Sequence, residues 1–217
     1  AYGLACYRND AGESYRITLE DVLEVVQVSR LSPYVTCKVS SHREVGKIFG
    51  LGVMGFLGSV LEIEAVAFPA RTQGQGTIRF NDTAGSMAKD SVFNAASVIR
   101  KLTGEDMANY DLHVNDGPSA GVAIFLAILS AIQGRPIPQD LAVTGEVSIQ
   151  GKVRAVGGIC EKIYGARQAG IKAILLPGEN QKDVPADLKG IQVVAVSTVE
   201  EIIRHVFPPT GVDDLVS

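Results

Sequence analysis

The chain has 217 residues with 46% hydrophobic content, so it can bury a sizeable core in one large domain, with or without a small appendage, and these values argue against disorder. Its net charge of −4 gives no general attraction for nucleic acid or anionic lipid, and no uninterrupted apolar stretch reaches the roughly 18 to 20 residues of a membrane span. The cysteines Cys6, Cys37 and Cys160 are widely separated and form no C-x-x-C pair, so we expect neither a disulfide framework nor a zinc site, and a reducing cytoplasm fits best.

The first part of the chain differs in pattern from the remaining residues. Thr18 precedes acidic residues and apolar residues at helical spacing, which predicts a helix that ends before Pro33. Residues 45–70 are punctuated by glycine and alternate apolar with acidic side chains, a pattern typical of a β-hairpin or meander. Residues 84–102 place apolar side chains on one helical face, and Gly104 follows as a natural C-cap, so we predict an amphipathic helix there.

The remainder of the chain alternates short apolar runs with helical patterns. The mostly apolar run 119–133 is expected to be a buried helix, with Ser119 at its start. The predicted strands are residues 110–114, 141–149, 171–176 and 191–196, and the other predicted helices are residues 160–169 and 199–206. This alternation predicts a layered α/β domain.

A serine motif followed by a lysine is the most informative feature of the chain. Residues 116–121 read Asp-Gly-Pro-Ser-Ala-Gly, and Lys162 follows Ser119 by 43 positions. A serine hydroxyl is a poor nucleophile at neutral pH, and a lysine serves as its base only where burial lowers the lysine pKa enough to leave a neutral amine. The pair therefore predicts a dry pocket, lined in part by apolar residues next to Lys162 and by the helix 119–133.

The same serine permits a second interpretation. Residues 117–121 form a literal G-x-S-x-G between a predicted strand and a predicted helix, as in the nucleophile elbow of Ser–His–Asp hydrolases. The only histidine after Ser119 is His205, which lies among charged residues of the last predicted helix and is better explained as a solvated helix residue. A hydrolase that uses Ser119 and His205 therefore stays the alternative.

Three other motif matches lack the context that their chemistry needs. Residues 50–55 fit G-x-G-x-x-G, but a strand follows instead of the helix that binds a pyrophosphate, so we interpret these glycines as β-turn residues. Residues 145–152 resemble a phosphate loop with one residue too many, and residues 86–89 fit S-x-x-K without the partner motifs of penicillin-recognising enzymes. We therefore expect no nucleotide site in this chain.

An ordered series of motifs resembles the proteolytic domain of Lon proteases. The series is LEIEA (61–65), AKDS (88–91), DGPSAG (116–121), TGE (144–146), GKV (151–153), VGG (156–158), EK (161–162) and ILLPGEN (174–180). The resemblance covers residues 45–207 and is nearer to the LonB and LonC branches than to LonA. It implies the Lon proteolytic-domain fold, ribosomal protein S5 domain 2-like, within the α/β (α+β layered) class. Residues 1–44 resemble the helical tail of a preceding ATPase module, and residues 208–217 are expected to form a C-terminal tail.

The resemblance implies a serine endopeptidase that degrades unfolded or damaged proteins. Ser119 would attack the scissile carbonyl, and Lys162 would take its proton and later return it to the leaving amine. The N-terminus of the helix 119–133 would direct backbone N–H groups toward the developing oxyanion. Thr144 would hydrogen-bond the amine, and Gly117 and Pro118 would shape the turn. The supporting residues expected at the site are Thr144, Asp116, Gly117, Pro118 and His113.

The resemblance also carries expectations about cofactors and partners. We expect no cofactor in this chain, because ATP and magnesium belong to an ATPase module outside it. Unfolded proteins or peptides are the expected substrates, and a homohexameric ring is the expected assembly of the complete enzyme. We expect no nucleic acid partner, no membrane segment in this chain and a cytoplasmic location. A non-proteolytic Lon-like ring scaffold stays an alternative, although such domains generally lack the Ser–Lys pair that this chain retains.

One junction departs from the family pattern. Lon sequences usually place a longer loop between the His-Val strand and the Asp-Gly-Pro-Ser motif, whereas here residues 113–115 run directly into Asp116. Either the loop is shortened in this protein, or residues are missing from the sequence between Asn115 and Asp116. We favour the second explanation. Residues missing at this point would affect the expected roles of His113 and Asp116 more than the expected role of Ser119.

Overall fold

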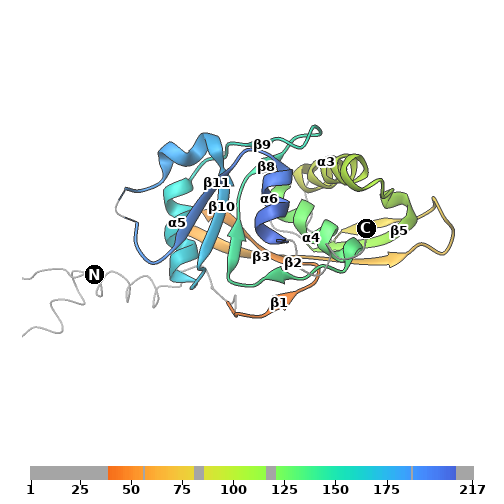
Figure 1. The fold of residues 1–217 in the computed structure, drawn as a ribbon, viewed down its shortest axis with the longest axis horizontal. Coiled ribbons are helices and arrows are strands. Elements are labelled where there is room, and N and C mark those ends of the chain that lie inside the picture. The colour runs from red at the N-terminus through yellow and green to blue at the C-terminus, as the bar shows by residue number, and fades with distance from the viewer. Residues whose placement is uncertain (1–38, 56, 81–85, 116–120, 187, 209–217) are drawn as a thin grey trace, which may run out of the picture. The chain divides into compact units, whose positions relative to one another are not determined.

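The computed structural model describes residues 39–55, 57–80, 86–115, 121–186 and 188–208 (Figure 1). These residues belong to the compact unit Cys37–Ser217, the second of two units into which the chain divides. The predicted helix after Thr18 and residues 116–120, which include Ser119, lie outside the described residues. The structure therefore shows the frame of the predicted site and not its serine.

A mixed sheet of seven strands forms the centre of the domain. Its strands are β2 (Lys47–Met54), β3 (Leu57–Pro69), β4 (Ile78–Phe80), β5 (Tyr110–Asn115), β7 (Leu141–Val143), β10 (Ala173–Pro177) and β11 (Gln192–Val196). In space they follow the order β11-β10-β7-β2-β3-β5-β4. The strands from β11 to β2 are parallel, and β2, β3 and β5 form an antiparallel meander. The predicted hairpin of residues 45–70 is confirmed as the β2–β3 pair.

Two short sheets lie beside the main one. β1 (Arg43–Glu44) pairs with β6 (Ile137–Pro138), and β8 (Glu146–Val147) pairs with β9 (Val153–Arg154). Arg43 and Glu44 belong to residues 1–44, which were expected to precede the main domain, yet they pair with β6. The described part of the unit thus begins before residue 45.

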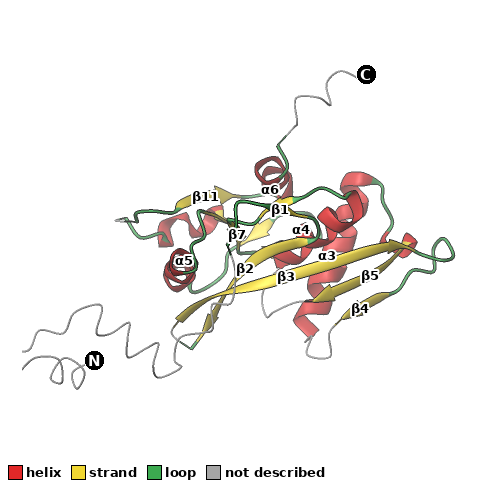
Figure 2. Cartoon of the chain, turned by 90° about the horizontal axis from the view of Figure 1, so that it is seen from below, coloured by secondary structure: helices red, strands yellow, loops and turns green. Residues whose placement is uncertain are grey.

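Helices cover both faces of the sheet and enclose two separate cores. On one face, the first core joins Ile48 and Ile63 to three helices, and on the other face the second core joins Phe49 and Val60 to α5. Ile48 and Phe49 enter different cores because successive strand side chains point to opposite faces. Figure 2 shows α3 and α4 behind the part of the sheet formed by β3, β5 and β4. The helices are α3 (Ser86–Thr103), α4 (Gly121–Gln133), α5 (Ile159–Gln168) and α6 (Val199–Val206), with 3-10 segments η1 (Met107–Asn109) and η2 (Gly178–Asp183).

Two helix predictions are confirmed together with their physical basis. α4 is buried along Gly121–Ser130, as expected for a helix that is apolar on all sides. α3 ends before Gly104, whose φ of +76° is the left-handed conformation that glycine adopts most easily, and the Gly104 N–H donates to the Arg100 carbonyl at 3.0 Å. The predicted layered α/β class is therefore correct.

Two details of the β structure differ from the predictions. The strand expected at 141–149 is interrupted between β7 and β8, because Gly145 has a φ of +133° that turns the chain out of the ladder. The glycines of 50–55 were expected in a turn, but Gly50 and Gly52 lie inside β2, and only Gly55 has the positive φ of a turn residue. Hydrophobic pattern alone did not reveal either feature.

Candidate active site

Lys162 is buried at the start of α5. The side chain is only 4% exposed, and its Nζ donates to Thr144 Oγ1 at 3.2 Å. The helix begins here because Gly158 adopts the left-handed conformation, with φ of +69°, and its carbonyl then accepts the Lys162 N–H at 3.0 Å. Lys162 is therefore not a solvated charge on a helix surface.

A close contact between two glycines holds α5 against the hairpin. A Cβ atom on Gly58 of β3 would overlap the Glu161 carbonyl, and one on Gly165 of α5 would overlap the backbone of Gly58. Only residues without a side chain allow the strand and the helix to approach so closely. The apolar side chains of Ile159 and Ile163 then enter the core between them. This packing fixes the part of α5 that carries Lys162.

Burial lowers the pKa of the Lys162 amine below its ordinary value of 10.5, because the charged form loses its hydration. The carboxylate of Glu146 acts in the opposite direction and raises this pKa, with the smaller effect. Among the described residues, no carboxylate forms an ion pair with Lys162. Burial therefore shifts the amine toward the neutral form, whose lone pair can accept a proton, as the dyad chemistry requires.

Thr144 lies where three elements meet. The residue is 3% exposed, follows β7, and donates its backbone N–H to the Leu175 carbonyl of β10 at 3.0 Å. The next residue, Gly145, accepts the N–H of Val122 in the first turn of α4 at 3.1 Å. Thr144 Oγ1 thus joins the amine of α5 to the point where α4 begins.

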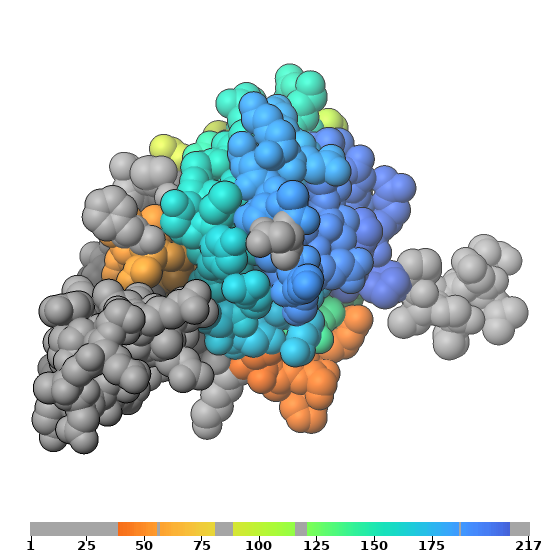
Figure 3. All heavy atoms as spheres, turned by 90° about the vertical axis from the view of Figure 1, so that its left-hand side faces the viewer, coloured from red at the N-terminus to blue at the C-terminus, as the bar shows by residue number. Residues whose placement is uncertain are grey.

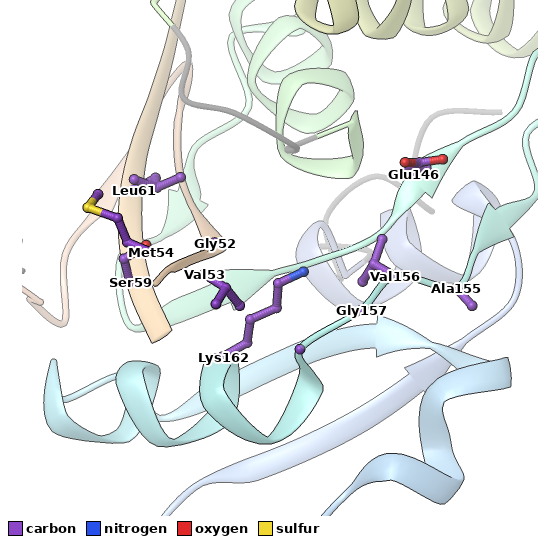
Figure 4. Close-up of a pocket in the computed structure, with 11 residues that line it drawn as sticks. Gly52, Val53, Met54, Ser59, Leu61, Glu146, Ala155, Val156, Gly157 and Lys162 are labelled. Atoms are coloured by element: carbon purple, nitrogen blue, oxygen red, sulfur yellow. The ribbon is translucent and has the colours of Figure 1, made fainter. Parts of the chain in front are cut away.

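A groove of about 550 Å³ opens in front of the Lys162 amine. One wall is the end of the β2–β3 hairpin, including Val53 and Met54, and the opposite wall is the segment 155–158. Figure 4 shows Lys162 pointing from α5 between these walls, with Glu146 on the far side. β2 pairs with β7 only at Phe49 and Gly50, so in the part of the chain that the structure describes the groove-facing edge of β2 has no strand partner after Gly50.

The predicted site residues have different outcomes. The structure brings Lys162 and Thr144 together, whereas Asp116, Gly117, Pro118 and Ser119 lie outside the described residues. His205, of the alternative hydrolase, is exposed on α6 and is not among the described residues that line the groove. The roles of the residues around Ser119 stay predictions.

His113 does not reach this groove. It pairs with Val66 of β3 and lines a separate hollow with Glu64 and Arg79. The groove in front of Lys162 is lined from β3 by Ser59 and Leu61, and His113 is not among the described residues that line it. The role of His113 at the site stays a prediction.

Sequence reasoning missed several parts of this site. Gly58 and the hairpin wall lie about one hundred positions before Lys162, and no local pattern signals their contact with α5. Glu146 belongs to the TGE motif, but no role was predicted for it. In the part of the chain that the structure describes, no group of three or more His, Cys, Asp or Glu side chains can hold a metal ion, and no helix is long and apolar enough to cross a membrane.

Comparison with known proteins gives a consistent result. Residues 17–209 match the family described as the Lon protease (S16) C-terminal proteolytic domain. Similar proteins include Lon protease 2 of Bacillus subtilis, 37% identical over 89% of this chain and 39% of that protein, and the archaeal Lon protease of Pyrococcus abyssi, 33% identical over 89% and 22%. The Lon protease of Haemophilus influenzae is 33% identical over 81% of this chain and 24% of that protein. The chain thus spans about two fifths of the length of these relatives, or less.

The alignments also bear on the junction before Asp116. The alignment with the Bacillus subtilis protein has 218 positions, one more than the whole chain has residues, although it covers 89% of the chain. The relative therefore contains residues that have no counterpart here, as the prediction of a segment lacking between Asn115 and Asp116 requires. The junction itself borders the undescribed residues, and the prediction stands untested.

Proposed function

This chain belongs to the family of Lon protease C-terminal proteolytic domains, and from that premise we propose that it is a serine endopeptidase domain with Ser119 as nucleophile and Lys162 as general base. The observation that carries the proposal is the buried Lys162 amine, held by Thr144 Oγ1 at 3.2 Å and facing a groove. Burying a lysine costs free energy, and it is unusual unless the amine is paired or functional.

The length of the chain supports the pairing with Ser119. Two residues of extended chain span at most about 7 Å, and Ser119 precedes Gly121 by two positions. Gly121 begins α4 and lies against the backbone of Gly145 and Glu146, next to Thr144. The start of α4, two positions after Ser119, thus lies next to the residue that holds the Lys162 amine, which supports the proposed pairing.

The proposed reaction uses the neutral amine twice. Lys162 Nζ accepts the proton of Ser119 Oγ while the oxygen attacks the scissile carbonyl carbon, and the resulting ammonium gives that proton to the leaving amine. Water then attacks the acyl-enzyme, Nζ accepts its proton, and the proton returns to Ser119 Oγ as the ester bond breaks. The Thr144 hydroxyl accepts an N–H of the amine, which leaves the lone pair free to point elsewhere.

The groove favours an extended peptide as substrate. A peptide that lies along the unpaired edge of β2 can exchange backbone hydrogen bonds with it, and such pairing is largely independent of side chains. A folded protein does not present an isolated extended strand. The proposal therefore includes unfolded or damaged proteins as substrates, in agreement with the protease names of the relatives.

Further properties are proposed for the complete protein. These are a homohexameric ring, ATP and magnesium bound by an ATPase module outside this chain, a cytoplasmic location, and a position nearer the LonB and LonC branches than LonA. They rest on family membership and on relatives of which this chain is one part.

Cleavage of casein and of a fluorogenic peptide tests the dyad. We expect Ser119→Ala and Lys162→Ala each to lower the rate by about a thousandfold or more, while circular dichroism shows an unchanged fold. His205→Ala is the matched control and should retain full activity. Unchanged cleavage in either dyad variant would remove that residue from the mechanism, and loss in His205→Ala alone would favour the Ser–His–Asp alternative. A wild-type chain without activity on any substrate would favour the ring scaffold.

A further inference from the structure

Asn180 is a buried amide that the proposed mechanism does not use. It lies in η2 and is 4% exposed. Its Oδ1 accepts the Val156 N–H at 2.9 Å, and its Nδ2 donates to the Val156 carbonyl at 3.0 Å and to Asp183 Oδ2 at 2.8 Å. Reversing the amide would set donor against donor and acceptor against acceptor, so these partners fix its orientation. One side chain thus satisfies both backbone groups of Val156, as a neighbouring strand would.

Val156 belongs to the groove wall that faces the β2–β3 hairpin. The wall segment 155–158 leaves β9 at Arg154 and enters α5 at Ile159, and in the described structure it belongs to no strand. It contains Gly157 and Gly158, which are the residues with the most backbone freedom. A hydrogen bond from Cys160 Sγ to the Asp183 carbonyl at 3.3 Å also joins η2 to α5. Figure 3 shows α5, in cyan, beside the blue surface that contains η2.

We propose that Asn180 is a positioning residue for peptide binding, which holds the segment 155–158 in place so that the groove keeps its shape in front of Lys162. The inference rests on the proposed function for the identity of the ligand as an extended peptide. Without the amide, a segment with two adjacent glycines is free to move, and ordering each residue on binding costs about 1 to 2 kcal/mol of conformational entropy. Loss of Asn180 therefore weakens binding before it changes the chemistry.

The first experiment measures binding without cleavage. A fluorescein-labelled peptide from unfolded casein is titrated by anisotropy into Ser119→Ala, Ser119→Ala with Asn180→Ala, and Ser119→Ala with Gln181→Ala. Gln181 is the matched control because it is the next residue of η2 and its side chain is exposed. We expect about tenfold weaker binding with Asn180→Ala, the equivalent of two ordinary hydrogen bonds, and no change with Gln181→Ala. Equal affinities in all three proteins would overturn the proposal.

Kinetics and amide exchange separate positioning from loss of structure. In the active chain, Asn180→Ala should raise KM about tenfold and change kcat less than about threefold. The Val156 amide should exchange with deuterium at least about tenfold faster, while the amides of β10 keep their protection. If kcat and the protection of the β10 amides both fell, Asn180 would have only a structural role, and the proposal would be contradicted.

A double substitution keeps the test valid even where Asn180→Ala folds poorly. Asn180→Asp keeps the acceptor for Val156 N–H but sets two carboxylates against each other, and Asp183→Asn removes that repulsion by supplying an amide donor. We expect the double variant to bind peptide more tightly than Asn180→Asp alone. No recovery would contradict the network. Failure of the wild-type chain to cleave would refute the proposed function and not this inference, because the binding comparison does not require cleavage.

Discussion

Two hollows of the molecule differ in the way that they are built. The groove in front of Lys162, about 550 Å³, has walls from the β2–β3 hairpin, β8, the segment 155–158 and α5. The hollow beside His113, about 380 Å³, is formed by three neighbouring strands of one sheet, β3, β4 and β5. Lys162 is 4% exposed, whereas Glu64, Arg79 and His113 are all exposed.

The difference shows what a general base needs. To remove water from an amine, several elements from distant parts of the chain must converge around it. One face of a single sheet covers an amine on one side only. Both hollows contain basic and apolar side chains. The groove lowers the pKa of the lysine that it holds. The packing of its walls, the hydrogen bond to its lysine and the charge of Glu146 can each be changed separately to test this comparison.

The largest expected effect comes from breaking the frame of the groove. Gly58→Ala places a methyl group against the Glu161 carbonyl, so β3 and α5 must separate. We expect the free energy of unfolding to fall by about 3 kcal/mol, with loss of cleavage as α5 moves. Urea denaturation measures the change. Gly157→Ala is the control, because a Cβ there meets nothing within 4 Å. Equal stability of both variants would show that the close packing is not required.

The second effect concerns the hydrogen bond that directs the amine. Thr144→Val keeps the shape of the side chain and removes the acceptor for Lys162 Nζ. We expect kcat to fall about tenfold to a hundredfold, since the amine loses its orientation, while KM and the melting temperature change little. Steady-state kinetics with a fluorogenic peptide measures this. An unchanged kcat would mean that Thr144 does not orient the base.

The third effect is a shift along the pH axis. Activity requires neutral Lys162, so kcat/KM rises as pH increases through the lysine pKa. Glu146 raises that pKa, and Glu146→Gln removes its charge, so the rising limb should move to lower pH. Glu179→Gln, at an exposed residue of η2 outside the groove lining, should leave the limb in place. A shift to higher pH would contradict the sign of the Glu146 effect.

The smallest expected effect lies in the other hollow. His113→Ala should leave cleavage within about twofold of wild type, because this side chain lines the other hollow and is not among the described residues of the groove. The same peptide assay measures it. A loss comparable to that of Lys162→Ala would mean that His113 reaches the substrate and that the two hollows cooperate.

Much of the fold could be predicted from local patterns. The amphipathic and apolar helices became α3 and α4, and the glycine-rich alternation of residues 45–70 became the β2–β3 hairpin. The break at Gly145 was missed, because apolar residues continue across it and only the backbone angle reveals the turn. Periodicity reports which face is buried, and it does not report where a ladder stops.

The chemistry of the site was more predictable than its frame. A serine–lysine pair requires a buried amine, and that requirement anticipated the surroundings of Lys162 and its contact with Thr144. The contact of Gly58 with Gly165 and the bonds from Asn180 to Val156 join residues far apart in sequence, so no local signal indicates them. The separate hollow beside His113 could not be predicted for the same reason, since it joins side chains of three strands.

Titration of the Lys162 amine tests the central claim most directly. In the intact chain with isotope-labelled lysine, nuclear magnetic resonance follows the side-chain signal that disappears in Lys162→Met. A midpoint below the ordinary value of 10.5 is predicted, because burial disfavours the charged amine, and the rising limb of kcat/KM should have the same midpoint. A midpoint at or above 10.5 would contradict the account, because the amine would then be charged at neutral pH and unable to serve as the base.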